Sequence, residues 1–180
     1  MQATGPTQAD PIRRRAWFAS HGRPARRERG AMTVGEICNR VVTVADRATP
    51  LTDAAKLMRE HHVGSLVVVE NRAGARVPVG ILTDRDIVVA VVARGVDPTT
   101  LTAADVMAGE LLTVREQDSE FDALALMRRR GVRRVPVVAA DGALAGIVTV
   151  DDLLEIVAEQ LDDIVRAITS EQAQERRARR

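Results

Sequence analysis

Two short stretches of the chain carry residues that can bind a sugar and a phosphate side by side. The stretch 80–86 (GILTDRD) returns at 146–152 as GIVTVDD. Each predicts the end of a buried strand, then a threonine, then a helix whose first turn carries an aspartate. Backbone N–H groups at a helix start lack partners, so an anion is favoured there. An ionised carboxylate accepts hydrogen bonds only, which suits the vicinal hydroxyls of a ribose.

The same residues also have a purely structural interpretation. A threonine that precedes a helix can cap it through its side-chain oxygen, and an aspartate in the first turn is favoured by the helix dipole. A single copy favours this interpretation, but the return of the whole stretch at matched positions favours a ligand site. Thr83, Asp86, Thr149 and Asp152 are therefore the first candidate binding residues.

The elements that must position these stretches also occur twice from residue 32 onward. A threonine-capped helical turn follows Thr33 and Thr102. The remaining matched elements are strands 41–44 and 111–114, helices that begin at Pro50 and at Asp118 or Ser119, strands 65–69 and 135–138, strands 77–82 and 144–148, and helices 84–93 and 150–167. The first copy has the longer hairpin, 70–76 against 139–143, and a hairpin absorbs such an insertion.

This order of elements resembles a CBS (cystathionine beta-synthase) domain, with 132–138 (VRRVPVV) entering the second strand and the G-I-L/V-T-x-x-D stretch leaving the third. Two copies in tandem resemble a Bateman module, and the resemblance covers about residues 32–167. It implies an α+β fold of two β-α-β-β-α repeats packed with pseudo-twofold symmetry. It also implies clefts that bind AMP, ADP, ATP, NAD or S-adenosylmethionine in relatives, a homodimer, and a module that senses rather than catalyses.

The resemblance assigns roles to residues beyond the two stretches. Strand backbone at 43–44 and 113–114 would face the adenine edge, with aliphatic packing on the ring from 135–136. Arginines would contact phosphate, since bidentate guanidinium–phosphate pairs are strong; a solvated pair is the alternative at 133–134. The expected ligand-binding residues are Thr43, Val44, Thr83, Arg85, Asp86, Thr113, Val114, Arg133, Arg134, Val135, Pro136, Thr149 and Asp152.

The two clefts are expected to differ chemically. Gly64 and Ser65 occupy, in the first copy, the positions that Arg133 and Arg134 occupy in the second. We therefore expect the cleft that contains Arg134 to bind phosphate better, and the first copy to offer the weaker site.

Charge and composition divide the chain into four parts. Residues 1–31 carry seven arginines against two acids, a net charge of +5, which leaves −4 for the rest of a chain whose formal net charge is +1. We expect a disordered basic tail over 1–31, repeats over 32–98 and 99–168, and a charged tail over 169–180. The repeated elements begin close after Met32, and we therefore hypothesise that translation starts at Met32.

Several functional classes are disfavoured by composition. The only cysteine, Cys38, excludes an internal disulfide and fits a cytoplasmic location. Three aromatic residues in 180 argue against stacking platforms for nucleic acid. The uncharged run 87–93 is too short to span a membrane. An alternative remains: an interaction protein with empty clefts whose basic tail contacts nucleic acid or a protein partner.

Catalytic and metal sites are not indicated. No nucleophile–base pair or phosphate-cradling glycine loop is found, and the adjacent His61 and His62 cannot both face one ion from a helix. We therefore expect no enzyme activity, no required cofactor and no metal, with an adenosine nucleotide as regulatory ligand and an effector protein of unknown identity. The apolar excess of the helix over 151–168 indicates packing on a partner subunit or on its own module.

Overall fold

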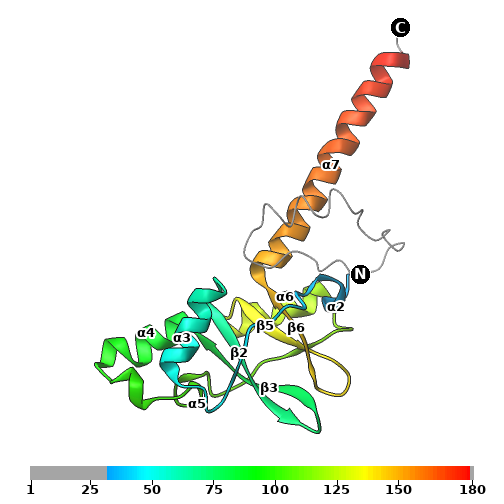
Figure 1. Ribbon diagram of the computed structural model, residues 1–180. Helices are drawn as coiled ribbons and strands as arrows, with labels where there is room; N and C mark the ends of the chain where they lie inside the picture. Colours follow the sequence, from blue (N-terminus) through cyan, green and yellow to red (C-terminus); the bar gives the residue numbers. More distant parts are fainter. Residues whose placement is uncertain (1–31, 179–180) are drawn as a thin grey trace, which may run out of the picture.

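The computed structural model describes residues 32–178, so the predictions for 1–31 lie outside the described residues (Figure 1). The predicted α+β fold of two packed repeats is confirmed. In chain order the elements are α2 (Val34–Ile37), β1 (Val44–Asp46), α3 (Leu51–Glu60), β2 (Ser65–Arg72), β3 (Ala75–Thr83), α4 (Asp84–Ala90), η1 (Val92–Arg94), η2 (Pro98–Thr100), α5 (Ala103–Val106), β4 (Val114–Arg115), α6 (Glu120–Arg130), β5 (Arg134–Val138), β6 (Leu144–Thr149) and α7 (Val150–Ala178).

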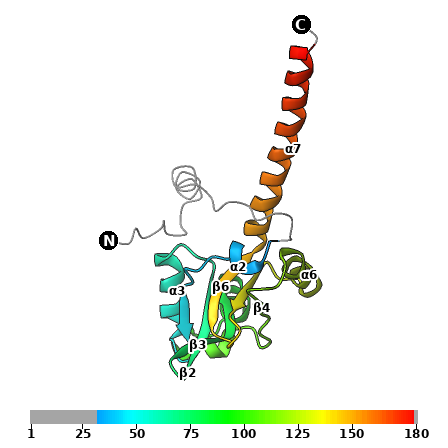
Figure 2. The same ribbon diagram turned by 90° about the vertical axis from the view of Figure 1, so that its right-hand side faces the viewer.

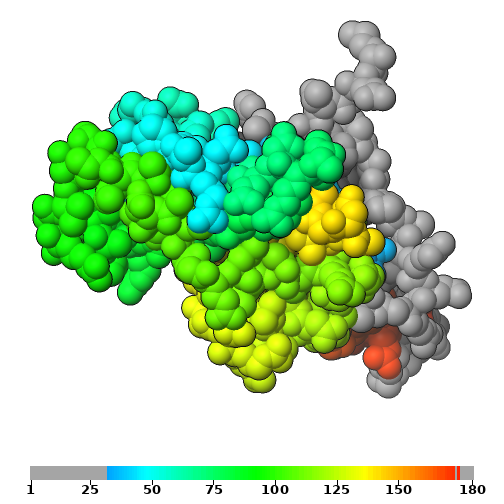
Figure 3. All heavy atoms as spheres, turned by 90° about the horizontal axis from the view of Figure 1, so that it is seen from below, coloured from blue at the N-terminus to red at the C-terminus, as the bar shows by residue number. Residues whose placement is uncertain are grey.

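Each repeat contributes one three-stranded sheet, in the order β1-β2-β3 and β4-β5-β6. The outer strand β1 runs parallel to β2, and β3 pairs antiparallel to β2; the second sheet repeats this arrangement. Both central strands carry a register shift at one place, Val68/Val69 and Val137/Val138. Val67, Val69 and Ile147 form a buried cluster in which both sheets take part, and a space-filling view shows the repeats packed side by side (Figure 3).

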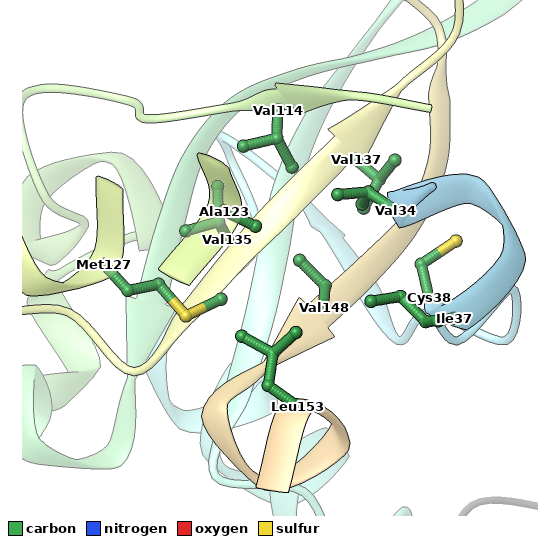
Figure 4. Packing of buried hydrophobic residues seen from close by; sticks show 10 residues of the cluster. All are labelled: Val34, Ile37, Cys38, Val114, Ala123, Met127, Val135, Val137, Val148 and Leu153. Carbon is green, nitrogen blue, oxygen red and sulfur yellow. The ribbon is translucent and has the colours of Figure 1, made fainter. Parts of the chain in front are cut away.

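The first residues of each repeat, 33–38 and 102–107, form a lead segment that packs on the other repeat. Val34, Ile37 and Cys38 of the first lead segment lie in one cluster with Val135 and Val148 of the second repeat (Figure 4). Conversely, Ala103 and Met107 pack in the core of the first repeat. The predicted division at 98/99 therefore follows the sequence repeat, whereas each hydrophobic core takes residues from both halves.

Backbone pairing shows the same exchange with pseudo-twofold symmetry. Thr33 bridges Ser119, and the matched residues Thr102 and Pro50 bridge each other. The N–H of Val34 donates to the carbonyl of Asp118 at 2.7 Å. Its counterpart, the N–H of Ala103, donates to Thr49 at 2.8 Å. The two lead segments are thus held by equivalent bonds, which makes the pair of repeats one folding unit.

The glycines that open the two repeated stretches make room for these exchanged segments. A Cβ on Gly80 would lie 2.3 Å from the sulfur of Met107, and one on Gly146 would lie 2.7 Å from the sulfur of Cys38. The lead segment therefore approaches the third strand closely at both glycines, through a flexible side chain at Gly80 and also through the backbone of Asn39 at Gly146. Cys38 itself is buried.

The first strand of each repeat begins later than predicted, and the predicted alignment there is wrong by one residue. Ala45 pairs with Val68, and Val114 pairs with Val137, so Ala45 rather than Val44 is the structural counterpart of Val114. Ala45 and Val114 are both nearly fully buried. The repeated Thr-Val letters at 43–44 and 113–114 suggested a register that side-chain burial does not support.

The last helices of the two repeats differ in length. α4 ends at Ala90 and continues as η1, which Gly95 terminates in the left-handed region at φ +66°. α7 extends beyond the predicted 150–167 to Ala178, and it runs away from the body of the molecule (Figures 1 and 2). Its sequence contains neither glycine nor proline, so nothing ends it early. Within residues 32–178, no helix is long and apolar enough to cross a membrane.

Candidate functional site

The two repeated stretches lie at equivalent ends of the two sheets. Thr83 ends β3 opposite Ser65, and Thr149 ends β6 opposite Arg134. In the first sheet the parallel register places Thr43 beside this same end, where its carbonyl accepts a hydrogen bond from the N–H of Val67 at 3.2 Å. The predicted strand and junction residues of each repeat therefore gather at one sheet end.

Both junctions form reciprocal capping boxes. The N–H and the hydroxyl of Thr83 donate to one carboxylate oxygen of Asp86 at 2.9 and 2.7 Å, while the N–H of Asp86 donates to the threonine oxygen at 3.1 Å. Thr149 and Asp152 repeat this with 2.9, 2.8 and 3.2 Å. The predicted alternative, a structural cap, is therefore the arrangement seen. Because the threonine hydroxyl donates its only proton to the aspartate, its direct role is to orient that carboxylate.

Three further boxes occur away from the sheet ends. They join Thr33 to Glu36, Thr102 to Asp105, and Ser119 to Asp122. In the last two, hydrogen bonds from the hydroxyl and the N–H hold the pKa of Asp105 and of Asp122 below the ordinary aspartate value. The box alone is thus no mark of a ligand, and the case for a site depends on what surrounds the two junctions.

Arg134 connects the two junctions. It lies opposite Thr149 in the β5–β6 ladder, yet its guanidinium nitrogen is 3.5 Å from the position that a Cβ on Gly64 would take. The carboxylate of Asp84, within the first junction, is 3.1 Å from the same position. The half-buried Arg134 therefore crosses from the second repeat to the first. A Cβ on Gly64 would be in ordinary van der Waals contact with the guanidinium and tight against the Asp84 carboxylate.

The other two candidate arginines are in different situations. Arg133 forms an ion pair with Asp151 at 3.4 Å, with 74% of the arginine side chain exposed. Such exposed pairs contribute little stability, and this is the solvated arrangement named as the alternative. Arg85 is exposed within the first junction, and its backbone N–H donates to the carboxylate of Asp84 at 2.7 Å.

The expected adenine-contact residues are buried to different degrees. The side chains of Val114, Val135 and Pro136 are inside the molecule, the first two in the core of the second repeat. Thr113 is exposed, and Val44 is half-buried at the start of β1. The aliphatic residues therefore form a wall behind the sheet end rather than a surface that a ring can touch.

Two residues of this region were not predicted. Asp84 and Gly64 both flank the Arg134 guanidinium. The only signal for Gly64 was its match with an arginine in the other copy, and no sequence pattern showed that Arg134 would cross between the repeats. Its reach depends on how the sheets pack.

A metal centre is not found in the described part of the chain. There, no group of three or more His, Cys, Asp or Glu side chains is close enough to hold an ion. His62 instead lines a shallow depression at the end of α3, together with Lys56, Arg59 and Glu60. This depression lies outside the predicted site.

The family model of the CBS domain matches residues 34–93 and 103–159. Hypoxic response protein 1 of Mycobacterium tuberculosis is 37% identical over 142 residues, which cover 78% of this chain and 96% of that protein. The uncharacterized protein MK0525 of Methanopyrus kandleri is 37% identical over 126 residues, 70% of this chain. The chain spans 63% of the latter's length.

Solved structures of related proteins share the fold, and three of them illustrate the likeness. Hypoxic Response Protein I with two coordinated zinc ions is 38% identical with a TM-score of 0.60, over 68% of this chain and 97% of that one. The hexameric CBS-CP12 protein from bloom-forming cyanobacteria is 28% identical with a TM-score of 0.60, over 78% and 87%. The CBS domain pair of protein MJ0100 in complex with 5′-methylthioadenosine and S-adenosyl-L-methionine is 25% identical with a TM-score of 0.61, over 69% and 98%. The chain therefore belongs to the CBS domain family, as a tandem pair of these domains.

Proposed function

We propose that this chain is a non-enzymatic sensor that binds an adenosine-containing ligand between its two repeats. The observation that carries the proposal is Arg134, which belongs to the second junction by backbone pairing and reaches Gly64 and Asp84 of the first. The two junctions thus offer this guanidinium and the oriented carboxylates of Asp86 and Asp152. The structure of a relative with S-adenosyl-L-methionine and 5′-methylthioadenosine supports the choice of adenosine ligands.

The roles proposed for individual residues follow from their hydrogen bonds. Asp86 and Asp152 would accept from ribose hydroxyls, and their threonines would hold them through the capping boxes. Thr43, Val44 and Thr113 line the sheet ends and would face the adenine edge. The buried aliphatic residues behind them supply rigidity instead of contact.

The sequence indicated the first copy as the weaker site, but because the guanidinium of Arg134 lies at the first junction, we propose that a phosphate binds there rather than at the second. Arg134 and Arg85 both stand at the first junction. At the second, Arg133 pairs with the carboxylate of Asp151. An anion there would compete with that carboxylate. At the first junction the carboxylate of Asp84 is also near, but within the described residues Arg134 forms no ion pair with it, so its guanidinium can bind a phosphate. We therefore propose an adenine nucleotide as the ligand of the first junction.

The test is thermal unfolding of the full chain with adenosine, AMP, ADP, ATP, NAD and S-adenosylmethionine. A ligand at about a hundred times its Kd should raise Tm by roughly 5–10 °C. Asp86→Asn keeps a capping acceptor but removes the charge, and it should abolish the rise for a ligand at the first junction; Asp152→Asn reports on the second. Asp122→Asn alters an equivalent box away from the sheet ends and serves as the matched control.

Arg134→Ala separates phosphate recognition from adenosine recognition. It should weaken AMP about ten- to a hundredfold, the equivalent of one lost charged hydrogen bond, and leave adenosine unchanged. If no ligand of the panel raises Tm, the sensor proposal fails, and the basic tail at 1–31 becomes the part to test against nucleic acid.

A sensor also needs a second state or a partner through which binding is read, because only a difference in affinity between two states transmits a signal. We propose that two copies pair through the exposed valines at the end of the first repeat. Val88, Val89 and Val92 are 55%, 51% and 68% exposed along α4 and η1. Charged groups at these positions are expected to break the pair.

A further inference from the structure

α7 carries an apolar stripe that the body of the molecule does not cover. Its side chains recur at alternating intervals of three and four residues, and all are about half exposed or more. They are Leu154 (63% exposed), Val157 (48%), Leu161 (58%), Ile164 (56%) and Ile168 (52%). Leu153 is buried and Ile156 partly buried on the repeat's own core, so the stripe lies beside the face that docks the helix.

The spacing is that of a heptad repeat, and the residue types within it are informative. Leu154, Leu161 and Ile168 take the a positions, and Val157 and Ile164 take the d positions. Leucine at a with a β-branched residue at d shifts coiled coils away from two strands toward three or four. The stripe spans about 21 Å of helix.

The positions beside the stripe widen it. The e and g sites hold Ala158, Gln160, Val165 and Ala167, none of which is charged. Two-stranded coiled coils use charged residues there to form interhelical ion pairs. An apolar face widened to a, d and e or g is typical of a helix in a bundle core.

The charged residues of this part of α7 lie on the opposite side of the helix. Glu155, Glu159, Asp162, Asp163 and Arg166 occupy b, c and f positions, and Arg166 pairs with Asp162 at 2.8 Å on the helix's own surface. A charged target peptide would find no complementary side chains along the stripe. A second copy of α7 would meet only uncharged residues along the stripe and beside it, so self-association is the match that charge permits.

We infer that α7 helices from four copies of this chain associate through the stripe into a four-helix bundle, so that the protein is a tetramer. This inference does not depend on ligand binding. The bundle covers the 154–168 stripe and ends near Glu171, where the next d position is acidic.

The experiment is the oligomeric state of the full chain by sedimentation equilibrium. The test variant is Leu161→Glu with Ile164→Glu; both residues are exposed in one copy, so each repeat keeps its core. The control variant, Thr169→Glu with Ser170→Glu, adds the same charge at exposed b and c positions of the same helix. Circular dichroism checks that both variants remain folded.

We expect four chain masses for the wild type and the control, and fewer than four for the test variant. Dimers in the test variant are expected if the α4 valines pair two copies, and monomers are expected if they do not; either result supports the bundle. A wild type with fewer or more than four chains overturns the inference. So does a tetramer that both double variants preserve.

Discussion

At the scale of the residue, the same hydrogen-bonded box serves two purposes. Five times in residues 33–152 a serine or threonine bonds reciprocally with the acid three positions later. Each box satisfies N–H groups that a helix start leaves open. At Thr83 and Thr149 it also fixes a carboxylate at the end of a buried strand, and position rather than chemistry separates these two boxes from the others.

Hydrogen bonds to aspartates at helix starts and turns make part of the folding stability depend on pH in the acidic range. The pKa of Asp105 and of Asp122 is lowered in the folded chain by hydrogen bonds from Thr102 and Ser119, and that of Asp97 by bonds from Thr99. In the unfolded chain aspartate titrates near pH 3.9. Because the folded pKa is lower, the stabilisation is complete above that pH and is lost as pH falls toward the folded value.

The prediction is that Asp105→Asn with Asp122→Asn flattens the acid side of the stability curve. Between about pH 5 and pH 3 the double variant should lose less Tm than the wild type does. The control is Glu155→Gln with Asp163→Asn, which removes two charges on exposed α7. Equal acid slopes in both double variants would assign the effect to net charge instead.

The sequence predicted the threonine and aspartate of each junction correctly, but it did not predict which residues surround them. The repeated threonine and aspartate were visible because local hydrogen bonding is encoded by spacing of three. The crossing of Arg134 toward Gly64 was not, because it depends on the packing of two sheets. The predicted match of 43–44 with 113–114 was also wrong, because Ala45 and Val114 are the residues buried at equivalent positions of the two cores.

At the scale of the element, the exchanged lead segments explain why the repeats carry glycine where they do. Strand and helix types followed from apolar runs and caps, so the sequence predicted the order of elements correctly. It could not show which repeat each lead segment would join. Cys38 is buried and Met107 is partly buried, and each lies against a glycine of the opposite repeat.

Gly146→Ala is predicted to destabilise the fold more than Gly80→Ala. A Cβ on Gly146 would lie 2.8 Å from the carbonyl oxygen of Asn39, a backbone atom that is itself paired with Ile147. At Gly80 the obstacle is the flexible side chain of Met107, which can move. We expect a loss of about 2–3 kcal/mol for Gly146→Ala and about 1 kcal/mol for Gly80→Ala.

Urea unfolding measures the loss of unfolding free energy in Gly146→Ala and in Gly80→Ala. Gly109→Ala is the control, since a Cβ there meets no atom within 4 Å and should change stability little. An equal loss of unfolding free energy in Gly80→Ala and Gly146→Ala would contradict the prediction. It would mean that each lead segment moves away as a rigid unit, whether the contact is with backbone or side chain.

At the scale of the whole molecule, the exposed apolar side chains within residues 32–178 include two separate groups along helices. One is the α7 stripe and the other consists of the valines of α4 and η1. Figure 1 shows α4 at one end of the body and α7 leaving it elsewhere. Exposed patches of this kind mark interaction sites, and two of them that do not overlap permit an assembly with two kinds of interface.

The last prediction tests whether these interfaces are independent. Val88→Glu with Val92→Glu should leave the α7 bundle and its four chains in place, because the substituted residues lie outside the stripe. Combined with Leu161→Glu and Ile164→Glu, it should yield monomers, since both interfaces are then charged. Asn71→Glu with Gln117→Glu, at exposed polar sites, is the control combined with the α7 variant, and this combination should remain dimeric. Sedimentation equilibrium at several concentrations distinguishes these states. If the combined variant stays dimeric, a surface other than the α4 valines pairs the copies; if the α4 variant alone becomes monomeric, the bundle does not form without that pair.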